Sequence, residues 1–279
     1  MKQPIKVTDA IFPRPVLLVA TCNDDGSIDV MSVAFESKPR QFHIFFIPLH
    51  KFIKMKRLTF TFILLAMCLT GFSQRDWFRF NDYKADNERI INDKKYPEVV
   101  FMGNSITENW AYFHPEFFTS HNYLGRGIGG QTSAHMLVRF QSDVIDLHPK
   151  AVVIMAGTND VAHNDFWVTP EQVVNNVISM CTLAKANGII PIISSITPCI
   201  SFVWRPEIEN AGQTIVDINK CLKAYAESNG IIYVDYHSAL ADENQGFPKS
   251  LSGDGCHPDP DTYFIMEEMV LKAIHEALK

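Results

Sequence analysis

The sequence has no apolar run long enough to form an ordinary transmembrane helix. Such a helix needs roughly 20 consecutive apolar residues, and the longest run, from Leu58 to Leu69, is clearly shorter. The chain also has no Cys-x-x-Cys pair, which argues against a zinc ribbon and against a dithiol redox motif. It contains no internal repeat and no low-complexity tract. These absences favour an ordinary globular protein.

Basic residues are fewer than acidic residues in most of the chain. The protein has 279 residues, of which 47% are apolar and 20% are charged, as expected for a globular domain with a full core. Residues 1–74 carry a net charge of +4, whereas residues 75–279 carry −10. An acidic body without a basic cluster argues against nucleic acids and anionic membrane surfaces as partners. The sequence leaves the oligomeric state open.

Cysteine is infrequent, and its spacing does not indicate a disulfide framework. The six cysteines are Cys22, Cys68, Cys181, Cys199, Cys221 and Cys256. A domain of about 200 residues can bury enough apolar surface without disulfides. We therefore expect the last four to be buried thiols, although an exported protein could pair them.

Residues 55–74 have the pattern of a secretory signal peptide. Lys56 and Arg57 precede the apolar run, and the small residues Gly71 and Ser73 follow it. The pattern predicts cleavage near Ser73 and export to the periplasm or the exterior, with no stable membrane association afterwards. Met67 stands where a lipoprotein signal needs a small residue, which disfavours lipidation at Cys68. The alternative is an uncleaved anchor over 58–73.

Residues 1–54 lie ahead of this predicted signal peptide, although a signal peptide belongs at the very start of a chain. Residues 12–38 read as two strands joined by the turn Asn23-Asp24-Asp25-Gly26. This stretch resembles the opening hairpin of a flavin reductase-like, FMN-binding split barrel, and the resemblance ends near Lys38. One hairpin cannot close a barrel. We therefore interpret 1–54 as a fragment without an FMN site, joined ahead of a chain that starts at Met55; the alternative is a cytoplasmic tail.

From Arg75 onward, strands and helices alternate. Short β-branched runs bounded by turn residues predict strands at 98–103, 122–128, 151–157, 189–197 and 231–237. Helical spacing predicts helices over 131–147, from a capping box at Thr169 to Gly188, over 207–229 and over 260–278. This alternation predicts an α/β fold, with a five-stranded parallel sheet covered on both faces. In such sheets, ligands bind beyond the carboxyl ends of the strands.

The residues after these strands could form the catalytic set of a serine hydrolase. Ser105 follows the first strand, and the pair Asp254 and His257 lies one loop beyond the last. A serine hydroxyl needs a base within hydrogen-bond reach, and an acid must orient that base. Alone, each residue has a plainer interpretation: Ser105 as a helix cap, and the Asp-x-x-His pair as a solvated turn. Their order along one sheet edge favours catalysis.

The same edge could supply an oxyanion hole. The candidate donors are the backbone N–H groups of Ser105 and Gly130 and the side-chain amide of Asn159. Gly130 has no side chain, so its N–H can approach a substrate closely. Alone, Gly129-Gly130 would be read as a turn, and Asn159-Asp160 as a loop cap.

The motifs "FMGNSIT", "RGIGGQTS", "MAGTND" and "DGCHP" together resemble the SGNH hydrolases, also called the GDSL esterase/lipase family. The resemblance covers about 97–279, and the stretches "GIGGQTS…LVRF" and "TLAKANG" are most similar to the platelet-activating-factor acetylhydrolase-like branch. It implies a three-layer α/β/α, flavodoxin-like fold and ester hydrolysis without a metal or cofactor. The implied residues are the triad Ser105, Asp254 and His257 and the oxyanion donors Ser105, Gly130 and Asn159.

Two sequence features qualify the resemblance. The family usually has Asp before the serine, where this chain has Asn104. That Asp is not the triad acid, and Asn keeps one acceptor, so we expect catalysis to survive. The chain has no G-x-S-x-G elbow around Ser105, which disfavours the α/β-hydrolase fold.

Three other functions fit parts of the sequence. Gly125-x-Gly127-x-x-Gly130 satisfies a dinucleotide-binding pattern, although it follows the second strand. A catalytically silent carbohydrate-binding module could stack sugars on its tryptophans, which are Trp77, Trp110, Trp167 and Trp204. The stretch "DGCHPDPD" could bind a cation, although its prolines suit a loop better.

The substrate is the least constrained prediction. The loop 197–209 follows the fourth strand, and Asn104, Phe202, Trp204 and Arg205 could wall a pocket there. Packing within the loop is the plainer interpretation of these side chains. No long apolar lid is visible, so the sequence favours short acyl groups, such as acetyl esters on carbohydrates. A lysophospholipase or a broad-specificity esterase is the alternative.

Overall fold

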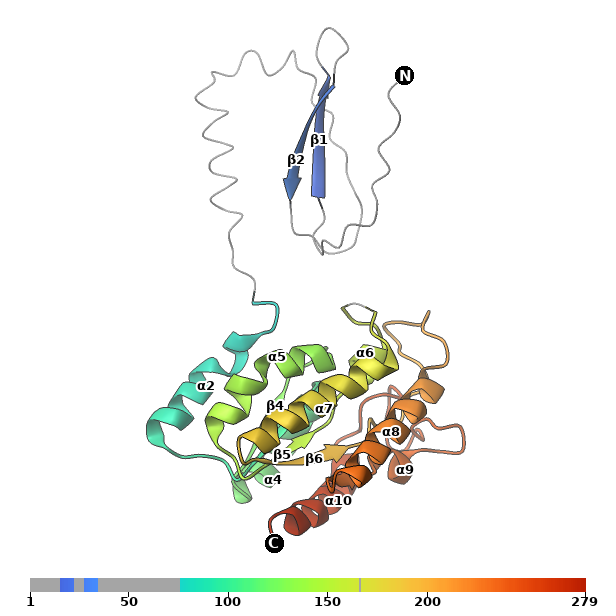
Figure 1. The fold of residues 1–279 in the computed structure, drawn as a ribbon. Helices are drawn as coiled ribbons and strands as arrows, with labels where there is room; N and C mark the ends of the chain where they lie inside the picture. The colour runs from blue at the N-terminus through green and yellow to red at the C-terminus, as the bar shows by residue number, and fades with distance from the viewer. Residues whose placement is uncertain (1–15, 23–27, 35–75, 166) are drawn as a thin grey trace. The chain divides into compact units, whose positions relative to one another are not determined.

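The computed structural model describes residues 76–165 and 167–279, together with the backbone of 16–22 and 28–34 (Figure 1). The chain divides into two compact units, Met1–Arg75 and Asp76–Lys279. In the first unit, β1 (Val16–Cys22) pairs antiparallel with β2 (Ile28–Ala34), as the predicted hairpin requires. The predicted turn at 23–26, the signal peptide at 55–74 and Cys68 lie outside the described residues.

The second unit is built on the predicted parallel sheet of five strands. They are β3 (Val99–Gly103), β4 (Tyr123–Gly127), β5 (Ala151–Ile154), β6 (Ile190–Ser194) and β7 (Ile232–Val234). Their order across the sheet is β4-β3-β5-β6-β7. Because the first strand lies between the second and the third, the chain reverses direction across the sheet there. In open α/β sheets, ligands bind at such a reversal, which here lies at the carboxyl ends of β3 and β5.

Helices cover both faces of the sheet and make three layers (Figure 1). The layer on one face contains α2 (Phe80–Asp93), α5 (Ser133–Asp143), α7 (Pro170–Ala186) and α8 (Ala211–Ser228). The layer on the other face contains α3 (Ser105–Phe113), α4 (Pro115–Ser120), α9 (Tyr236–Leu240) and α10 (Thr262–Ala277). Two short helices, η2 (Ile145–Leu147) and α6 (Thr158–Val161), lie in connections. None of the helices in the described residues is long and apolar enough to cross a membrane.

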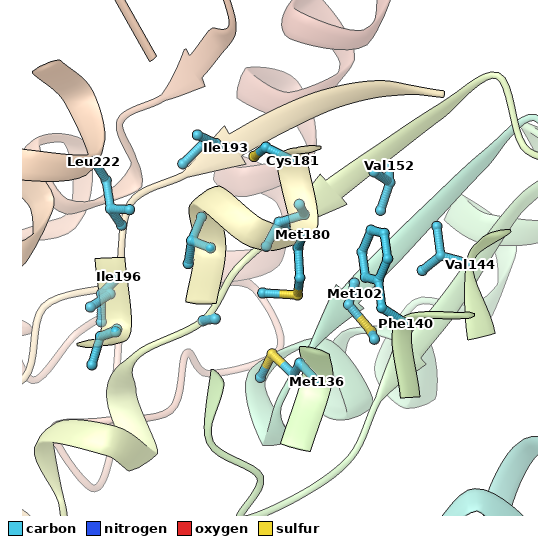
Figure 2. Packing of buried hydrophobic residues seen from close by; sticks show 14 of the residues in the cluster. Met102, Met136, Phe140, Val144, Val152, Met180, Cys181, Ile193, Ile196 and Leu222 are labelled. Atoms are coloured by element: carbon cyan, nitrogen blue, oxygen red, sulfur yellow. The ribbon is translucent and has the colours of Figure 1, made fainter. Parts of the chain in front are cut away.

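Alternate residues of each strand enter different cores. In β3, Val100 and Met102 pack toward α5 and α7, whereas Val99 and Phe101 pack toward α3 and α10. Figure 2 shows the first core, in which Met102 lies beside Met136 and Phe140 of α5. The strands bury side chains on both faces, which explains why they read as continuous apolar runs in the sequence.

The ends of several elements differ from the prediction. The strand predicted to reach 197 ends at Ser194, because the side-chain amide of Asn219 bonds both the N–H and the C=O of Ile196 in place of a neighbouring strand. The strand predicted to reach 237 ends at Val234, because Asp235 caps α9.

Two helix starts also differ, and a third is as predicted. The helix predicted from 131 begins at Ser133 and ends at Asp143 before η2, and the helix predicted from 207 begins at Ala211. The helix α8 does not extend further toward the N-terminus, because Asn210 has a left-handed backbone conformation with φ of 56°. The capping box of Thr169 and Gln172 is present as predicted.

The helix α3 lies directly on the end of β4. Gly103 and Gly127 are partners in the register of β3 and β4. A Cβ atom on Gly127 would stand 2.2 Å from the backbone nitrogen of Glu108 and 2.6 Å from the carbonyl oxygen of Asn104. The backbones therefore meet without a side chain between them, and this contact places the start of α3 above the sheet edge.

Candidate active site

The predicted nucleophile is the first residue of α3. Asn104 is the N-cap, and its Oδ1 accepts a hydrogen bond of 3.0 Å from the backbone N–H of Ile106. Ser105 therefore does not cap the helix, contrary to its plainer interpretation. Its Oγ instead lies 2.8 Å from Nε2 of His257. This hydrogen bond joins residues 152 positions apart in the chain.

The turn that carries His257 also supplies its acid. Oδ2 of Asp254 lies 2.7 Å from Nδ1 of His257, and Oδ1 accepts the backbone N–H groups of Cys256 and His257 at 2.9 and 2.8 Å. Burial would raise the pKa of Asp254, but the hydrogen bonds from His257 and Cys256 outweigh it and hold this pKa below its usual value. The ionised carboxylate can thus orient the imidazole and stabilise a positive charge on it.

Each of the three predicted oxyanion donors keeps an N–H that no acceptor among the described residues takes up. A Cβ atom built on Gly129 would stand 3.8 Å from Cβ of Ser105, so the loop that contains Gly130 passes beside the serine. Within the part of the chain that the structure describes, the N–H groups of Ser105 and Gly130 have no acceptor. Asn159 donates one amide proton to the carbonyl of Gln131 at 2.9 Å, which leaves the second proton available.

The model of the GDSL-like lipase/acylhydrolase family matches residues 101–264, which is more than half of the chain and spans the predicted motifs from Ser105 to His257. The chain belongs to this family. The predicted resemblance to the SGNH, or GDSL, hydrolases is therefore confirmed, and so is the α/β fold that it implied.

Solved structures of this family include similar chains. A GDSL-like lipase of Bacteroides thetaiotaomicron is 42% identical, covers 72% of this chain and 100% of its own, and superposes with a TM-score of 0.70. A structure from Bacteroides fragilis is also 42% identical and covers 74% of this chain and 100% of its own, with a TM-score of 0.71.

Curated relatives match over shorter stretches. The platelet-activating factor acetylhydrolase IB subunit alpha1 of Rattus norvegicus is 32% identical over 104 residues, 36% of this chain and 43% of that protein. An uncharacterized lipoprotein of Bacillus subtilis is 34% identical over 122 residues, 38% of this chain and 50% of that protein. The chain thus spans half or less of the length of these curated relatives.

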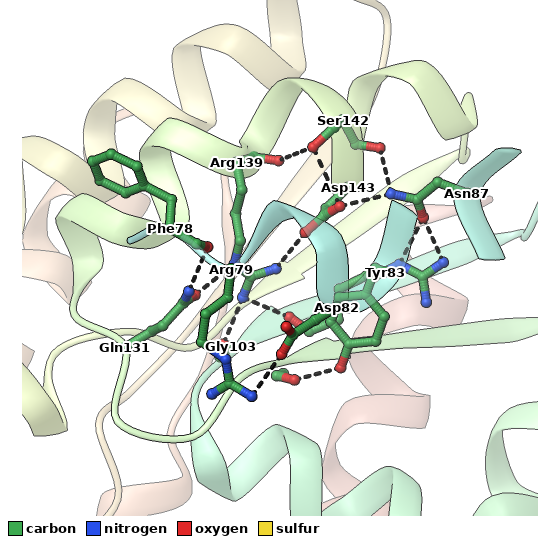
Figure 3. A network of polar contacts seen from close by, with 12 residues as sticks. Phe78, Arg79, Asp82, Tyr83, Asn87, Gly103, Gln131, Arg139, Ser142 and Asp143 are labelled. Atoms are coloured by element: carbon green, nitrogen blue, oxygen red, sulfur yellow. Dashed lines mark hydrogen bonds and ion pairs between the residues drawn. The ribbon is translucent and has the colours of Figure 1, made fainter. Parts of the chain in front are cut away.

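Side chains from α3 and from the start of α2 hold the loop that follows β4. We name residues 128–132 the donor loop, since they include Gly130. Gly129 donates its N–H to Oε2 of Glu108 at 2.9 Å and accepts from Nη1 of Arg79 at 3.2 Å. Tyr83 donates its hydroxyl to the carbonyl of Gly127, just before the loop (Figure 3).

The side chain of Gln131 ties the donor loop to a buried arginine. Its Oε1 accepts from Nε of Arg139 at 2.6 Å, and its Nε2 donates to the carbonyl of Phe78 at 2.8 Å (Figure 3). Arg139 is completely buried, forms an ion pair of 2.8 Å with Asp143 and donates to the carbonyl of Gly103. Burial lowers the pKa of Arg139, and the Asp143 carboxylate opposes this effect. No sequence motif predicted this network.

The conformation of Gly130 gives a second reason for glycine at this position. A Cβ atom there would meet no protein atom within 4 Å, and the close approach of a substrate to its N–H stays a prediction. Its φ of 80° lies in the left-handed region that favours glycine. The glycine is thus required by the turn of the donor loop.

The neighbour of Asn159 has a structural role. The carboxylate of Asp160 accepts the backbone N–H of Ser133 at 2.8 and 3.1 Å and its hydroxyl at 2.6 Å. Burial raises the pKa of Asp160, and these hydrogen bonds oppose the rise. Asp160 thus holds the start of α5, so the cap interpretation applies to the second residue of the pair, whereas the Asn159 amide bonds the donor loop at the carbonyl of Gln131.

The structure separates the four predicted pocket residues. Trp204 is 41% exposed, and its ring centroid lies 6.0 Å from that of His257. Phe202 is buried beneath Trp204, with centroids 5.3 Å apart, so it supports the wall without facing a ligand. Asn104 is buried as the cap, and Arg205 forms an ion pair of 2.9 Å with Glu207. Only Trp204 of the four lies at the triad with an exposed surface.

The structure also bears on the dinucleotide-binding, carbohydrate-binding and cation-binding interpretations of the sequence. Gly125 and Gly127 lie within β4, not in a turn, so they cannot form a phosphate loop as the dinucleotide-binding pattern requires. Trp110 is 1% exposed and belongs to the core, whereas Trp77, Trp167 and Trp204 are exposed. No group of three ligating side chains converges on a metal position in 76–165 or 167–279.

Three of the four cysteines expected to be buried are so. Cys181, Cys199 and Cys256 are buried, whereas Cys221 is exposed, so the prediction is wrong for that residue. The hydrogen bond with the Cys199 thiol and burial raise the pKa of Cys256 far above its usual value. The Cys256 thiol is therefore a poor nucleophile, although it is next to His257.

Proposed function

We propose that this protein is a serine esterase that hydrolyses short-chain esters, such as acetyl esters of carbohydrates. The observation that carries the proposal is the continuous hydrogen-bonded chain from Asp254 through His257 to Ser105, with contacts of 2.7 and 2.8 Å. This geometry suits acyl transfer, because the base is in reach of the nucleophile and the acid fixes the base.

The reaction proceeds in two halves. His257 takes the proton of Ser105 through Nε2 as Oγ attacks the carbonyl carbon, and the tetrahedral intermediate collapses when the imidazolium protonates the leaving alcohol. A water molecule then repeats the attack on the acyl-serine and releases the acid. Asp254 stays ionised throughout and stabilises the imidazolium.

The oxyanion of both intermediates would be held by three neutral donors. Two are the unpaired N–H groups of Ser105 and Gly130, and the third is the free amide proton of Asn159. Ser105 begins a helix, so the positive end of α3 adds to their effect. Removal of one such donor typically lowers kcat by about 10²–10³.

The surroundings of the triad support a short acyl group on a bulky polar alcohol. The side chains of His257 and Asp254 are 25% and 43% exposed, and the indole of Trp204 stands beside them. An exposed triad gives a large alcohol room, and an indole provides a flat apolar face beside it. The local similarity to a platelet-activating factor acetylhydrolase also favours acetyl esters. Lysophospholipase or broad esterase activity is the alternative.

Ser105→Ala tests this function directly. We expect hydrolysis of p-nitrophenyl acetate to fall to background while the circular dichroism spectrum stays unchanged, because the variant lacks only the nucleophilic oxygen. Turnover within tenfold of wild type in the folded variant would contradict the assignment. An inactive wild-type protein would favour the silent carbohydrate-binding module. p-Nitrophenyl esters of increasing chain length and an acetylated xylan would separate acetyl esterase from lysophospholipase or broad activity.

We also propose that the protein is exported through a signal peptide at 55–74, and that residues 1–54 take no part in the function. The basic, apolar and small-residue pattern of 55–74 supports export, as does the name of the lipoprotein relative in Bacillus subtilis. Lipid attachment at Cys68 is not proposed, because Met67 disfavours it.

A further inference from the structure

We infer that Asn164 is a positioning residue that orients the amide of Asn159 in the oxyanion hole and links this amide to the indole of Trp204. The inference rests on the proposed esterase function. It assigns a role to a loop residue that no sequence motif indicated.

Asn164 contacts two of the three oxyanion residues. Its Nδ2 donates to Oδ1 of Asn159 at 2.7 Å and lies 3.4 Å from the carbonyl oxygen of Gly130. Its backbone N–H also donates to the carbonyl of Asn159 at 3.1 Å. The side chain therefore bridges the first turn of α6 and the donor loop, which follow different strands of the sheet.

The orientation of Asn159 decides whether it can stabilise an oxyanion. A side-chain amide has a donor end and an acceptor end, and rotation by about 180° would point the acceptor at the developing negative charge. Two contacts oppose that rotation: Nδ2 donates to the carbonyl of Gln131, and Oδ1 accepts from Asn164. The second contact requires that Asn164 itself presents its donor end.

Trp204 fixes the orientation of Asn164. The indole Nε1 donates to Oδ1 of Asn164 at 2.9 Å, and an indole nitrogen can only donate. Asn164 must therefore turn its oxygen toward Trp204 and its nitrogen toward Asn159. The indole N–H of Trp204, which can only donate, thus sets the orientation of Asn164, and Asn164 in turn sets that of Asn159 in the oxyanion hole.

This chain connects the wall of the site to its chemistry. The Trp204 ring is 41% exposed and lies 6.0 Å from the His257 ring, so a bound substrate can contact it. A substrate that keeps the indole in place preserves the donor orientation of Asn159. A substrate that displaces it weakens the stabilisation of the transition state, so specificity is expressed in kcat as well as in KM.

Side-chain variants at position 164 test the role. Asn164→Ala removes the contact, and we expect kcat for p-nitrophenyl acetate to fall about tenfold with KM within about twofold. Asn164→Asp has the same shape, but its carboxylate repels Oδ1 of Asn159 and attracts Nδ2, so kcat should fall about a hundredfold. Trp204→Phe keeps the ring without the N–H and should lower kcat about threefold.

A double-mutant cycle distinguishes positioning from a general structural effect. In an Asn159→Ala background, Asn164→Ala and Asn164→Asp should cause no further fall in kcat, because the amide that they orient is absent. Asn187→Ala is the matched control: its Nδ2 bonds only the carbonyl of Leu183 on the surface, at the opposite edge of the sheet, so kcat should not change. Thermal unfolding of every variant checks that each is folded.

The possible failures are distinguishable. Full additivity of the falls in kcat, an effect on KM alone, or an unchanged kcat in a folded Asn164→Asp protein would overturn the inference and leave the esterase function standing. Absence of turnover in the wild-type protein would overturn the proposed function and this inference together.

Discussion

The turn that carries Asp254 and His257 and the loop that carries Gly130 meet at one sheet edge, but different contacts hold them. The turn is stabilised by its own neighbours: Gly255 donates to Oγ of Ser252 at 2.9 Å, and Gly253 donates to Asp259 at 3.1 Å. The side chains of Asp254 and His257 are partly exposed. Each of these two hydrogen bonds joins residues at most six positions apart.

The donor loop depends on distant residues. Arg79 and Phe78 contact it from positions 50 and 53 residues away, and the buried guanidinium of Arg139 joins it to Asp143 and to the end of β3. A local turn can lose a side chain without moving the rest of the fold. A buried network transmits the loss to everything that it joins. Activity and stability should therefore respond differently to changes in the two regions.

The largest expected effect lies in the turn. Asp254→Asn should lower kcat by about 10⁴, because the amide favours the wrong tautomer of the histidine, as in other Ser-His-Asp triads. The midpoint of thermal unfolding should move by less than about 4 °C, since the lost bonds are local and partly exposed. Steady-state kinetics and calorimetry on the same sample measure both. A large fall in the midpoint would mean that the turn is not independent of the fold.

The small stability difference should also depend on pH. The pKa of Asp254 is lowered in the folded protein, so its stabilising contribution is present above the usual pKa of an aspartate and is lost as pH falls through the folded-state pKa. Urea unfolding should thus show wild type and Asp254→Asn converging in acid.

The second effect should appear in stability. Arg139→Met replaces a buried arginine with an apolar side chain that has no guanidinium. It leaves the Asp143 carboxylate without its charged partner, so the free energy of unfolding should fall by about 3–5 kcal/mol. Arg89→Met is the control, since Arg89 pairs with Asp86 on the surface and its removal should leave urea unfolding unchanged. A loss below about 1 kcal/mol for Arg139→Met would show that the donor loop does not depend on this network.

The smallest effect concerns the start of the folded unit. A protein that begins at Arg75 should be fully active, whereas one that begins at Phe80 lacks the contacts of Phe78 and Arg79 with the donor loop, and its kcat should fall about fivefold. Kinetics of the two purified proteins test this.

N-terminal sequencing of the exported native protein tests the proposed cleavage near Ser73. A mature chain that retains Met1, or activity that is lost when 1–74 is removed, would refute the proposals for both segments.

The sequence predicted well whatever depends on neighbours in the chain. The strands, the capping box at Thr169 and the Asp254-x-x-His257 turn all follow from short patterns, and the structure has each of them. The order of motifs along the sheet edge was also sufficient to predict the contact between Ser105 and His257.

Contacts between distant residues were not predicted, because a charged residue reads as exposed until its partner is known. Arg126 and Arg139 are 2% and 0% exposed, against the usual tendency of arginine. One signal was available. Arg139 and Asp143, four residues apart, share the helix face of Met136 and Phe140, so a buried ion pair could have been predicted. The role proposed for Asn164 left no such pattern, because its partners lie in α6, in the donor loop and in the loop that follows β6.

The contact between α3 and the end of β4 has a consequence for natural variation. Gly127 admits no Cβ atom because the backbone of α3 already occupies that space, and at Gly103 an added Cβ would stand 2.0 Å from Oγ1 of Thr107. Any substitution at Gly127 must lift the helix that begins with Ser105. Homologues should therefore keep glycine at this position as strictly as they keep the serine, and a survey of sequence variation would rank a residue without chemical function beside the nucleophile.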